Sequence, residues 1–189
     1  MVSNRPAASV ARSVECTLAA GVALALLAVC LVGPSQASAA LKYKQPTCGK
    51  FQKKVDNSTG AKKRAAKKSL KQCQANMQVY KQVRNSHFVG TRADGVEIDT
   101  IYCGNGKWQD DVADDGRVGT NGWRIVDAKV RKGGSNFTAV VEAWIPGGTH
   151  VQGLIRNGAQ WQVGYEFGGE VKSPGDVEKT SASAVCATL

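Results

Sequence analysis

The sequence predicts an α+β protein in which a disulfide-linked helical hairpin precedes an antiparallel β-meander of about seven strands. Apolar residues recur at helical spacing up to residue 84, and from residue 87 onward they alternate with polar ones. Glycine- and asparagine-rich turns separate the alternating runs. We expect a cleavable signal peptide at 1–39, a basic helical hairpin at 40–85, and a β-rich domain at 86–189 whose C-terminal tail is pinned by a disulfide.

The N-terminal segment has the features of a secretory signal peptide. Arg5 and Arg12 precede an apolar run over residues 18–32, and small residues at 37–39 indicate cleavage before Ala40. The apolar run has 15 residues, which is too short for a helix to cross a hydrocarbon core of ~30 Å. We therefore expect a secreted, extracellular protein without a transmembrane segment after cleavage.

Two helices joined by a turn are predicted next. The apolar stripe of the first helix is Cys48, Phe51 and Val55, and that of the second is Ala66, Leu70, Cys73, Met77 and Tyr80. Residues 56–60, Asp-Asn-Ser-Thr-Gly, have turn and N-cap chemistry. Folding the chain back about this turn places Val55 opposite Ala66, Phe51 opposite Leu70, and Cys48 opposite Cys73. One antiparallel register thus satisfies all three pairs.

The cysteines predict the covalent scheme. Four of the six remain after signal cleavage, and an even number in an exported chain favours two disulfides. The hairpin register selects Cys48–Cys73, which leaves Cys103–Cys186. A bridge that closes a loop of about 25 residues stabilises the fold by roughly 3–4 kcal/mol through loop-closure entropy.

Seven strands are predicted in the β-rich domain. They occupy 87–92, 96–103, a short run from Trp108, 123–131, 137–145, 151–156 and 161–167. Asn-Gly pairs at 105–106 and 157–158 are typical of tight hairpin turns, so neighbouring strands should be antiparallel. Val126, Ala128 and Val130 should share one face, as should Trp161, Val163, Tyr165 and Phe167. The tail is expected to reach the strand that holds Cys103 and to add an eighth strand.

Three architectures fit this pattern. The strands can form an up-and-down barrel, a two-layer sandwich, or a strongly curved sheet that makes an open cone with the helices packed in its mouth. In a small barrel, the interior can hold one ligand.

Charge divides the chain into two regions. Residues 41–84 contain thirteen bases and one acid, Asp56, for a net charge of +12, whereas residues 85–189 carry a net charge of −3. The predicted polyanion-binding residues lie off the helical seam and are Lys62, Lys63, Arg64, Lys67, Lys68 and Lys71. Such a face attracts anionic polymers, acidic polysaccharides and anionic lipid surfaces. Nucleic acid is disfavoured because Phe51 and Tyr80 belong to the seam, which leaves no aromatic platform for bases.

The sequence indicates no cofactor and no catalytic motif. The two histidines, His87 and His150, have neither metal-ligand nor nucleophile spacing. The acidic residues Asp110, Asp111, Asp114 and Asp115 form a weak candidate Ca²⁺ site, although they do not follow the regular calcium-loop pattern.

We therefore expect a secreted, non-enzymatic binding protein. Its cationic hairpin would dock on an anionic envelope polymer, matrix polymer or surface, while its β domain binds a protein partner or small ligand. One alternative is a hydrolase inhibitor that presents the acidic loop 110–115. Another is an enzyme on a curved-sheet cone, which requires a deep pocket containing His150, Tyr165 or Glu166.

Overall fold

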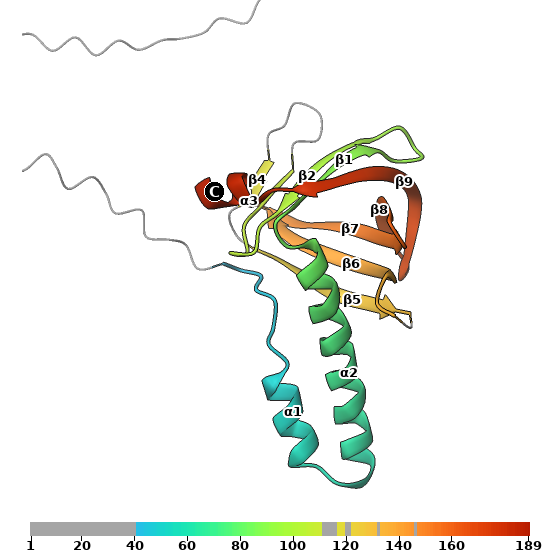
Figure 1. Ribbon diagram of the computed structural model, residues 1–189. Coiled ribbons are helices and arrows are strands. Elements are labelled where there is room, and N and C mark those ends of the chain that lie inside the picture. The colour runs from blue at the N-terminus through green and yellow to red at the C-terminus, as the bar shows by residue number, and fades with distance from the viewer. Residues whose placement is uncertain (1–40, 111–116, 120–121, 132, 146) are drawn as a thin grey trace, which may run out of the picture. The chain divides into compact units, whose positions relative to one another are not determined.

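The computed structural model describes residues 41–110, 117–119, 122–131, 133–145 and 147–189, so the predicted signal peptide lies outside the described residues. Helices α1 (Gly49–Asp56) and α2 (Gly60–Val83) precede the sheet, and helix α3 (Ser183–Thr188) follows it (Figure 1). The strands are β1 (Ser86–Thr91), β2 (Glu97–Tyr102), β3 (Trp108–Asp110), β4 (Arg117–Gly119), β5 (Trp123–Val130), β6 (Asn136–Ile145), β7 (Gly148–Asn157), β8 (Gln160–Phe167) and β9 (Glu170–Ser181).

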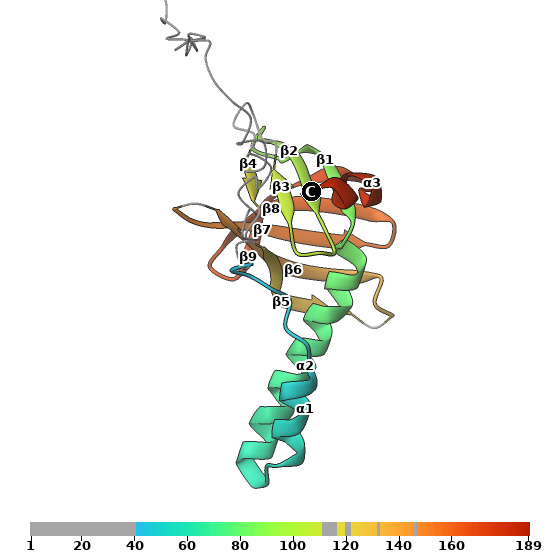
Figure 2. The same ribbon diagram turned by 90° about the vertical axis from the view of Figure 1, so that its left-hand side faces the viewer.

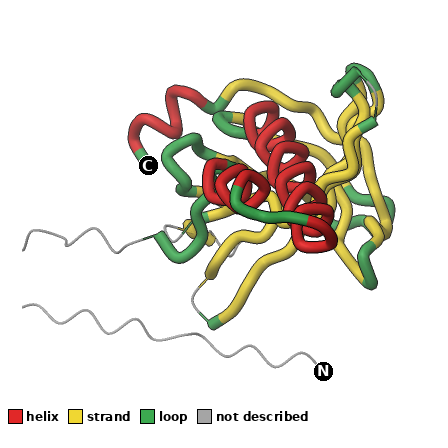
Figure 3. Tube along the Cα trace, turned by 90° about the horizontal axis from the view of Figure 1, so that it is seen from below, coloured by secondary structure: helices red, strands yellow, loops and turns green. Residues whose placement is uncertain are grey.

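The strands form one antiparallel sheet in the order β4-β3-β2-β1-β9-β8-β7-β6-β5. The chain thus enters the sheet near its centre with β1 and runs outward to β4 at one edge. It continues from β5 at the opposite edge and returns to the centre with β9. The sheet curls into a half-barrel, which Figure 3 shows from the helical end. This confirms the α+β class, and among the predicted architectures it agrees with the strongly curved sheet.

Two strands lie outside the seven that were predicted. Strand β4 has only three residues, which is too few to show an alternating pattern. Strand β9 carries Pro174 and Gly175 and has few apolar residues, yet it pairs with both β1 and β8 at the centre of the sheet. The expected eighth strand from the C-terminal tail is therefore present, and it is the longest in the sheet.

The core lies between the curled sheet and the second half of α2. Val79 and Val83 of α2 are fully buried together with Phe88, Trp123 and other strand residues. The Trp123 ring lies 4.9 Å from the Tyr80 ring, and its indole Nε1 donates to the Cys103 carbonyl over 2.9 Å. By contrast, α1 and the first half of α2 project away from the sheet (Figures 1 and 2).

A β-bulge in β5 changes which of its side chains face the core. The register with β6 shifts between Ile125 and Asp127, so Val126 is an extra residue in the strand. Ile125 and Ala128 are buried, whereas Val126 is only partly buried. The prediction that Val126 shares the face of Ala128 was therefore wrong, because strict alternation ends at the bulge. In β8, burial extends to Gly164 and stops there, with Tyr165 and Phe167 exposed.

Both predicted disulfides are present. Cys48–Cys73 joins the residue before α1 to the middle of α2, and Cys103–Cys186 ties α3 to the end of β2. Within the described residues, no helix has the length and apolar character needed to cross a bilayer. The disulfides are compatible with an oxidising, extracellular location.

Candidate functional site

The helical hairpin carries a cationic surface, here called the basic surface. Its members are exposed residues of α1 and of the first half of α2: Lys50, Lys53, Lys54, Lys62, Lys63, Arg64, Lys67, Lys68 and Lys71. In α2, no described side chain between residues 60 and 72 is buried. All six predicted polyanion-binding residues thus lie on one projecting hairpin.

The charges of the basic surface are not neutralised within the described residues. The ion pairs found there belong to the β-rich domain, for example Arg124–Glu142 at 2.8 Å, and none includes a base of the basic surface. The hairpin's one acid, Asp56, accepts a hydrogen bond from the side-chain amide of Gln52 over 2.8 Å. The positive charge of the hairpin therefore faces solvent.

Helical spacing also brings like charges together. Lys63 and Lys67, Arg64 and Lys68, and Lys67 and Lys71 are each four residues apart on exposed turns of α2. Each such pair destabilises a helix by about 0.2–0.5 kcal/mol. The hairpin therefore needs support from elsewhere in the protein.

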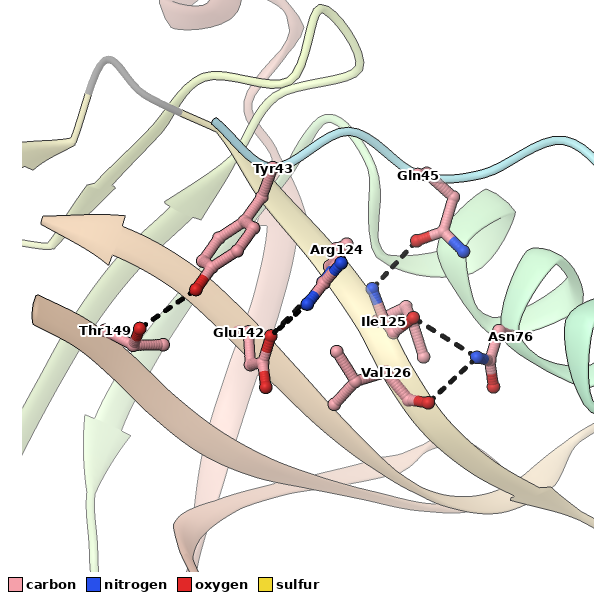
Figure 4. A network of polar contacts seen from close by, with 8 residues as sticks. All are labelled: Tyr43, Gln45, Asn76, Arg124, Ile125, Val126, Glu142 and Thr149. Atoms are coloured by element: carbon pink, nitrogen blue, oxygen red, sulfur yellow. Dashed lines mark hydrogen bonds and ion pairs between the residues drawn. The ribbon is translucent and has the colours of Figure 1, made fainter. Parts of the chain in front are cut away.

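Part of that support comes from side-chain amides that bind the bulge of β5 (Figure 4). The Asn76 Nδ2 of α2 donates to the carbonyls of Ile125 and Val126 over 3.3 and 3.1 Å. The Gln72 Nε2 donates to the Ala128 carbonyl over 3.1 Å, while the Gln45 Oε1 accepts from the Ile125 amide over 2.8 Å. Strand β5 is an edge of the sheet, and these contacts supply partners to three of its carbonyls and one of its amides.

The stripe of α2 that faces the sheet differs from the predicted one. Cys73, Asn76, Val79 and Val83 are buried, whereas Met77, which belonged to the predicted stripe, is only partly buried. The second half of α2 packs on the sheet rather than on α1. The face that it buries is therefore rotated around the helix from the face predicted to pack on α1. The sequence pattern did not indicate Asn76, because a polar residue adds nothing to an apolar periodicity.

The segment before α1 lies along β5 and completes the junction (Figure 4). The hydroxyl groups of Tyr43 and Thr149 are hydrogen-bonded over 3.0 Å, and the Arg124 guanidinium lies 4.5 Å from the Tyr43 ring centre. Gly122 has φ +102°, and a Cβ there would meet the Tyr43 carbonyl oxygen at 1.9 Å. Only glycine permits this close approach.

A cleft of about 360 Å³ lies where the hairpin meets β5, and we call it the hairpin cleft. Its lining includes Pro46, Phe51, Lys68, Ser69, Cys73 and Val126. The amides of Gln72 and Asn76 also line it, and both are held by the contacts described above. Its volume falls within the range of ligand pockets.

Polar side chains also meet inside the curled sheet. The Thr100 hydroxyl donates to Asp110 over 2.7 Å and accepts from the Gln152 amide over 3.2 Å, and the Tyr102 hydroxyl donates to Gln152. Burial, with a further contribution from Asp110, raises the pKa of Tyr102 well above 10. Tyr102 therefore remains a donor, and hydrogen bonds lead from it through Gln152 and Thr100 to the Asp110 carboxylate.

The predicted Ca²⁺ ligands are only partly described. Asp110 is buried, 4% exposed, and lies 3.4 Å from the His150 ring nitrogen, while Asp111, Asp114 and Asp115 lie outside the described residues. Among the residues that are described, no group of three His, Cys, Asp or Glu side chains is placed to hold a metal ion.

The three residues proposed for an enzyme pocket are engaged by different neighbours. His150 stacks on Trp108 and contacts Asp110. Tyr165 is 37% exposed and lies under the Arg92 guanidinium, and Glu166 accepts a hydrogen bond from the Gly169 amide over 2.6 Å. Each of the three side chains therefore has a partner outside this group.

The fold defines an α+β protein in which a disulfide-linked basic hairpin docks on a curled antiparallel sheet. Comparisons with protein-family models, curated proteins and solved structures found no match to this chain.

Proposed function

We propose that this protein is a secreted, non-catalytic binding protein whose basic surface docks it on an anionic polymer of the cell envelope or extracellular matrix. The observation that carries the proposal is the projecting hairpin with nine exposed bases, none of which is in an ion pair within the described residues. Polyanions are attracted to such a concentrated field.

The energetics of α2 support this proposal. A helix that only needed solubility would gain stability by alternating acids and bases at a spacing of four residues. This helix instead places bases at Lys63, Arg64, Lys67, Lys68 and Lys71. A bound polyanion would relieve their mutual repulsion, so the arrangement favours binding at the expense of stability.

An extended polymer fits the hairpin better than insertion into a membrane. The outer face of α2 has no bulky apolar side chains, whereas interfacial helices bury such residues below the headgroups. The two partly buried apolar residues of its first half, Ala66 and Leu70, belong to the predicted seam with α1. The β-rich domain is then available for a protein partner or small ligand.

The test measures binding of inorganic polyphosphate to the mature protein by titration calorimetry at 50 mM and at ~1 M salt. Because screening leaves a reach of only ~3 Å at 1 M salt, we expect binding to disappear there. Replacing Arg64, Lys67 and Lys71 by Gln should weaken binding by about tenfold or more.

The matched control replaces three bases of the β-rich domain, Lys107, Lys129 and Arg131, by Gln. It changes the net charge equally but leaves the basic surface intact, so the loss should be below about threefold. Equal losses in the two variants, or binding that persists at 1 M salt, would contradict docking through the hairpin.

A further inference from the structure

The hairpin cleft has a chemical character different from that of the basic surface around it. Pro46, Phe51, Cys73 and Val126 form apolar walls between α1, α2 and β5. Long charged side chains on a helix often lie across apolar surface of this kind. Here they leave open a cleft of about 360 Å³.

The amides that line the hairpin cleft have no spare protons for a ligand. Asn76 Nδ2 donates twice, to the carbonyls of Ile125 and Val126. Gln72 Nε2 also donates twice, to Asn76 Oδ1 over 2.9 Å and to the Ala128 carbonyl. The Ser69 hydroxyl donates to the Ala65 carbonyl over 3.3 Å. A ligand rich in hydroxyl or carbonyl groups would therefore find few donors, whereas an apolar chain fits these walls.

The lining of the same cleft contains one charged residue, Lys68. Lys68 contributes to its lining, is exposed, and is in no ion pair within the described part of the chain. Lys50 lies close by, with its ammonium 5.1 Å from the Phe51 ring centre. A ligand with an acidic head and an apolar tail would complement both the cation and the walls.

We propose that the hairpin cleft binds a single-chain anionic amphiphile of the fatty-acid type, with its carboxylate beside Lys68 and its chain between Phe51 and Val126. Lys68 belongs to both the basic surface and the cleft, but the apolar walls of the cleft take no part in polymer docking, so this site goes beyond the proposed function.

The first test titrates the mature protein with hexanoate, octanoate and decanoate below their micelle concentrations. Burying each additional methylene group should raise the affinity about two- to fourfold. An affinity that does not change with chain length would overturn the proposal, because the carboxylate alone would then account for binding.

The second test separates the cleft charge from the general field of the hairpin. Lys68→Gln should lower decanoate affinity about three- to fivefold, whereas Lys71→Gln on the outer face should lower it less than about twofold. Both substitutions should weaken polyphosphate binding to a similar degree. If they weaken decanoate binding equally, the ligand responds only to net charge and the cleft proposal fails.

The third test fills the cleft. Ser69→Trp places a large ring in the lining from an exposed helix position and should abolish decanoate binding while the helical circular-dichroism signal is retained. Ala65→Trp adds the same ring one turn away, outside the lining, and should leave decanoate affinity unchanged. Retained decanoate binding in Ser69→Trp would overturn the proposal, and retained polyphosphate binding would show that docking is unaffected.

Discussion

In the first half of α2, residues 60–72 bury no side chain, whereas each strand from β5 to β8 buries two or more. Both regions are stabilised by a disulfide, but only the sheet has a hydrophobic core of its own. The hairpin, with its high positive charge, is held by Cys48–Cys73 and by polar contacts to β5. The difference shows how one chain can present a charged extension that would not be expected to fold alone.

The largest expected effect tests whether the core resides in the sheet. Trp123 is fully buried and donates a hydrogen bond to Cys103, so Trp123→Ala should lower the free energy of unfolding by about 4–5 kcal/mol. Leu70→Ala in the hairpin should lower it by less than about 1.5 kcal/mol because Leu70 is only partly buried. Urea titration measures both, and similar losses would mean that the hairpin contributes as much core as the sheet.

The second prediction concerns the hairpin disulfide. Replacing Cys48 and Cys73 by Ser should cost about 3–4 kcal/mol, since the bridge closes a loop with a sequence separation of 25 residues. Far-ultraviolet circular dichroism should show lost helix, while tryptophan fluorescence of the sheet stays native. Simultaneous loss of both signals would show that the sheet depends on α1.

The third prediction tests the junction between the regions. Asn76→Ala removes both hydrogen bonds to the β5 bulge and should cost about 1–3 kcal/mol, because buried carbonyls lose their donor. Gln74→Ala, at an exposed position of the same helix, serves as the control and should change stability by less than about 0.5 kcal/mol. Equal effects would mean that the amide contacts add nothing to docking.

The smallest expected effect on stability comes from a charge reversal in α2, which should raise the free energy of unfolding but lower the affinity for polyphosphate. Lys67→Glu replaces two like-charge contacts, with Lys63 and Lys71, by opposite-charge ones and should stabilise the protein by about 0.5–1 kcal/mol at low salt. The same change should weaken polyphosphate binding. Thermal unfolding at 50 mM and ~1 M salt checks the first part, since screening should remove the gain. If the stability gain persists at high salt, its cause is not the removal of charge repulsion.

The elements that could be predicted from sequence rest on local or pairwise rules. The hairpin register that joined Cys48 to Cys73 needed only helical periodicity and a turn. The second disulfide followed from cysteine number, and the antiparallel sheet from tight turns and alternating residues. The candidate binding residues from Lys62 to Lys71 were found because exposed charge is visible in composition.

Other features could not be predicted from the sequence because the residues that contact one another are distant along the chain. Asn76 reads as an ordinary polar helix residue until the β5 bulge, some 50 residues away, supplies the carbonyls that it binds. Asp110 was grouped with the acidic loop, but Thr100 and His150 hold it inside the curled sheet. The hairpin cleft likewise combines residues from Pro46 to Val126.

The sequence by itself determined the two helices of the hairpin, the seven predicted strands, the disulfide pairs and the charge division, since periodicity, cysteine number and net charge can be read without knowing which distant segments pack together. Only the tertiary structure decided that β9 lies at the centre of the sheet, that α2 docks on a bulge, and that a cleft opens beside Lys68. The physical reason is that these features depend on close packing and on hydrogen bonds satisfied between segments far apart in the chain.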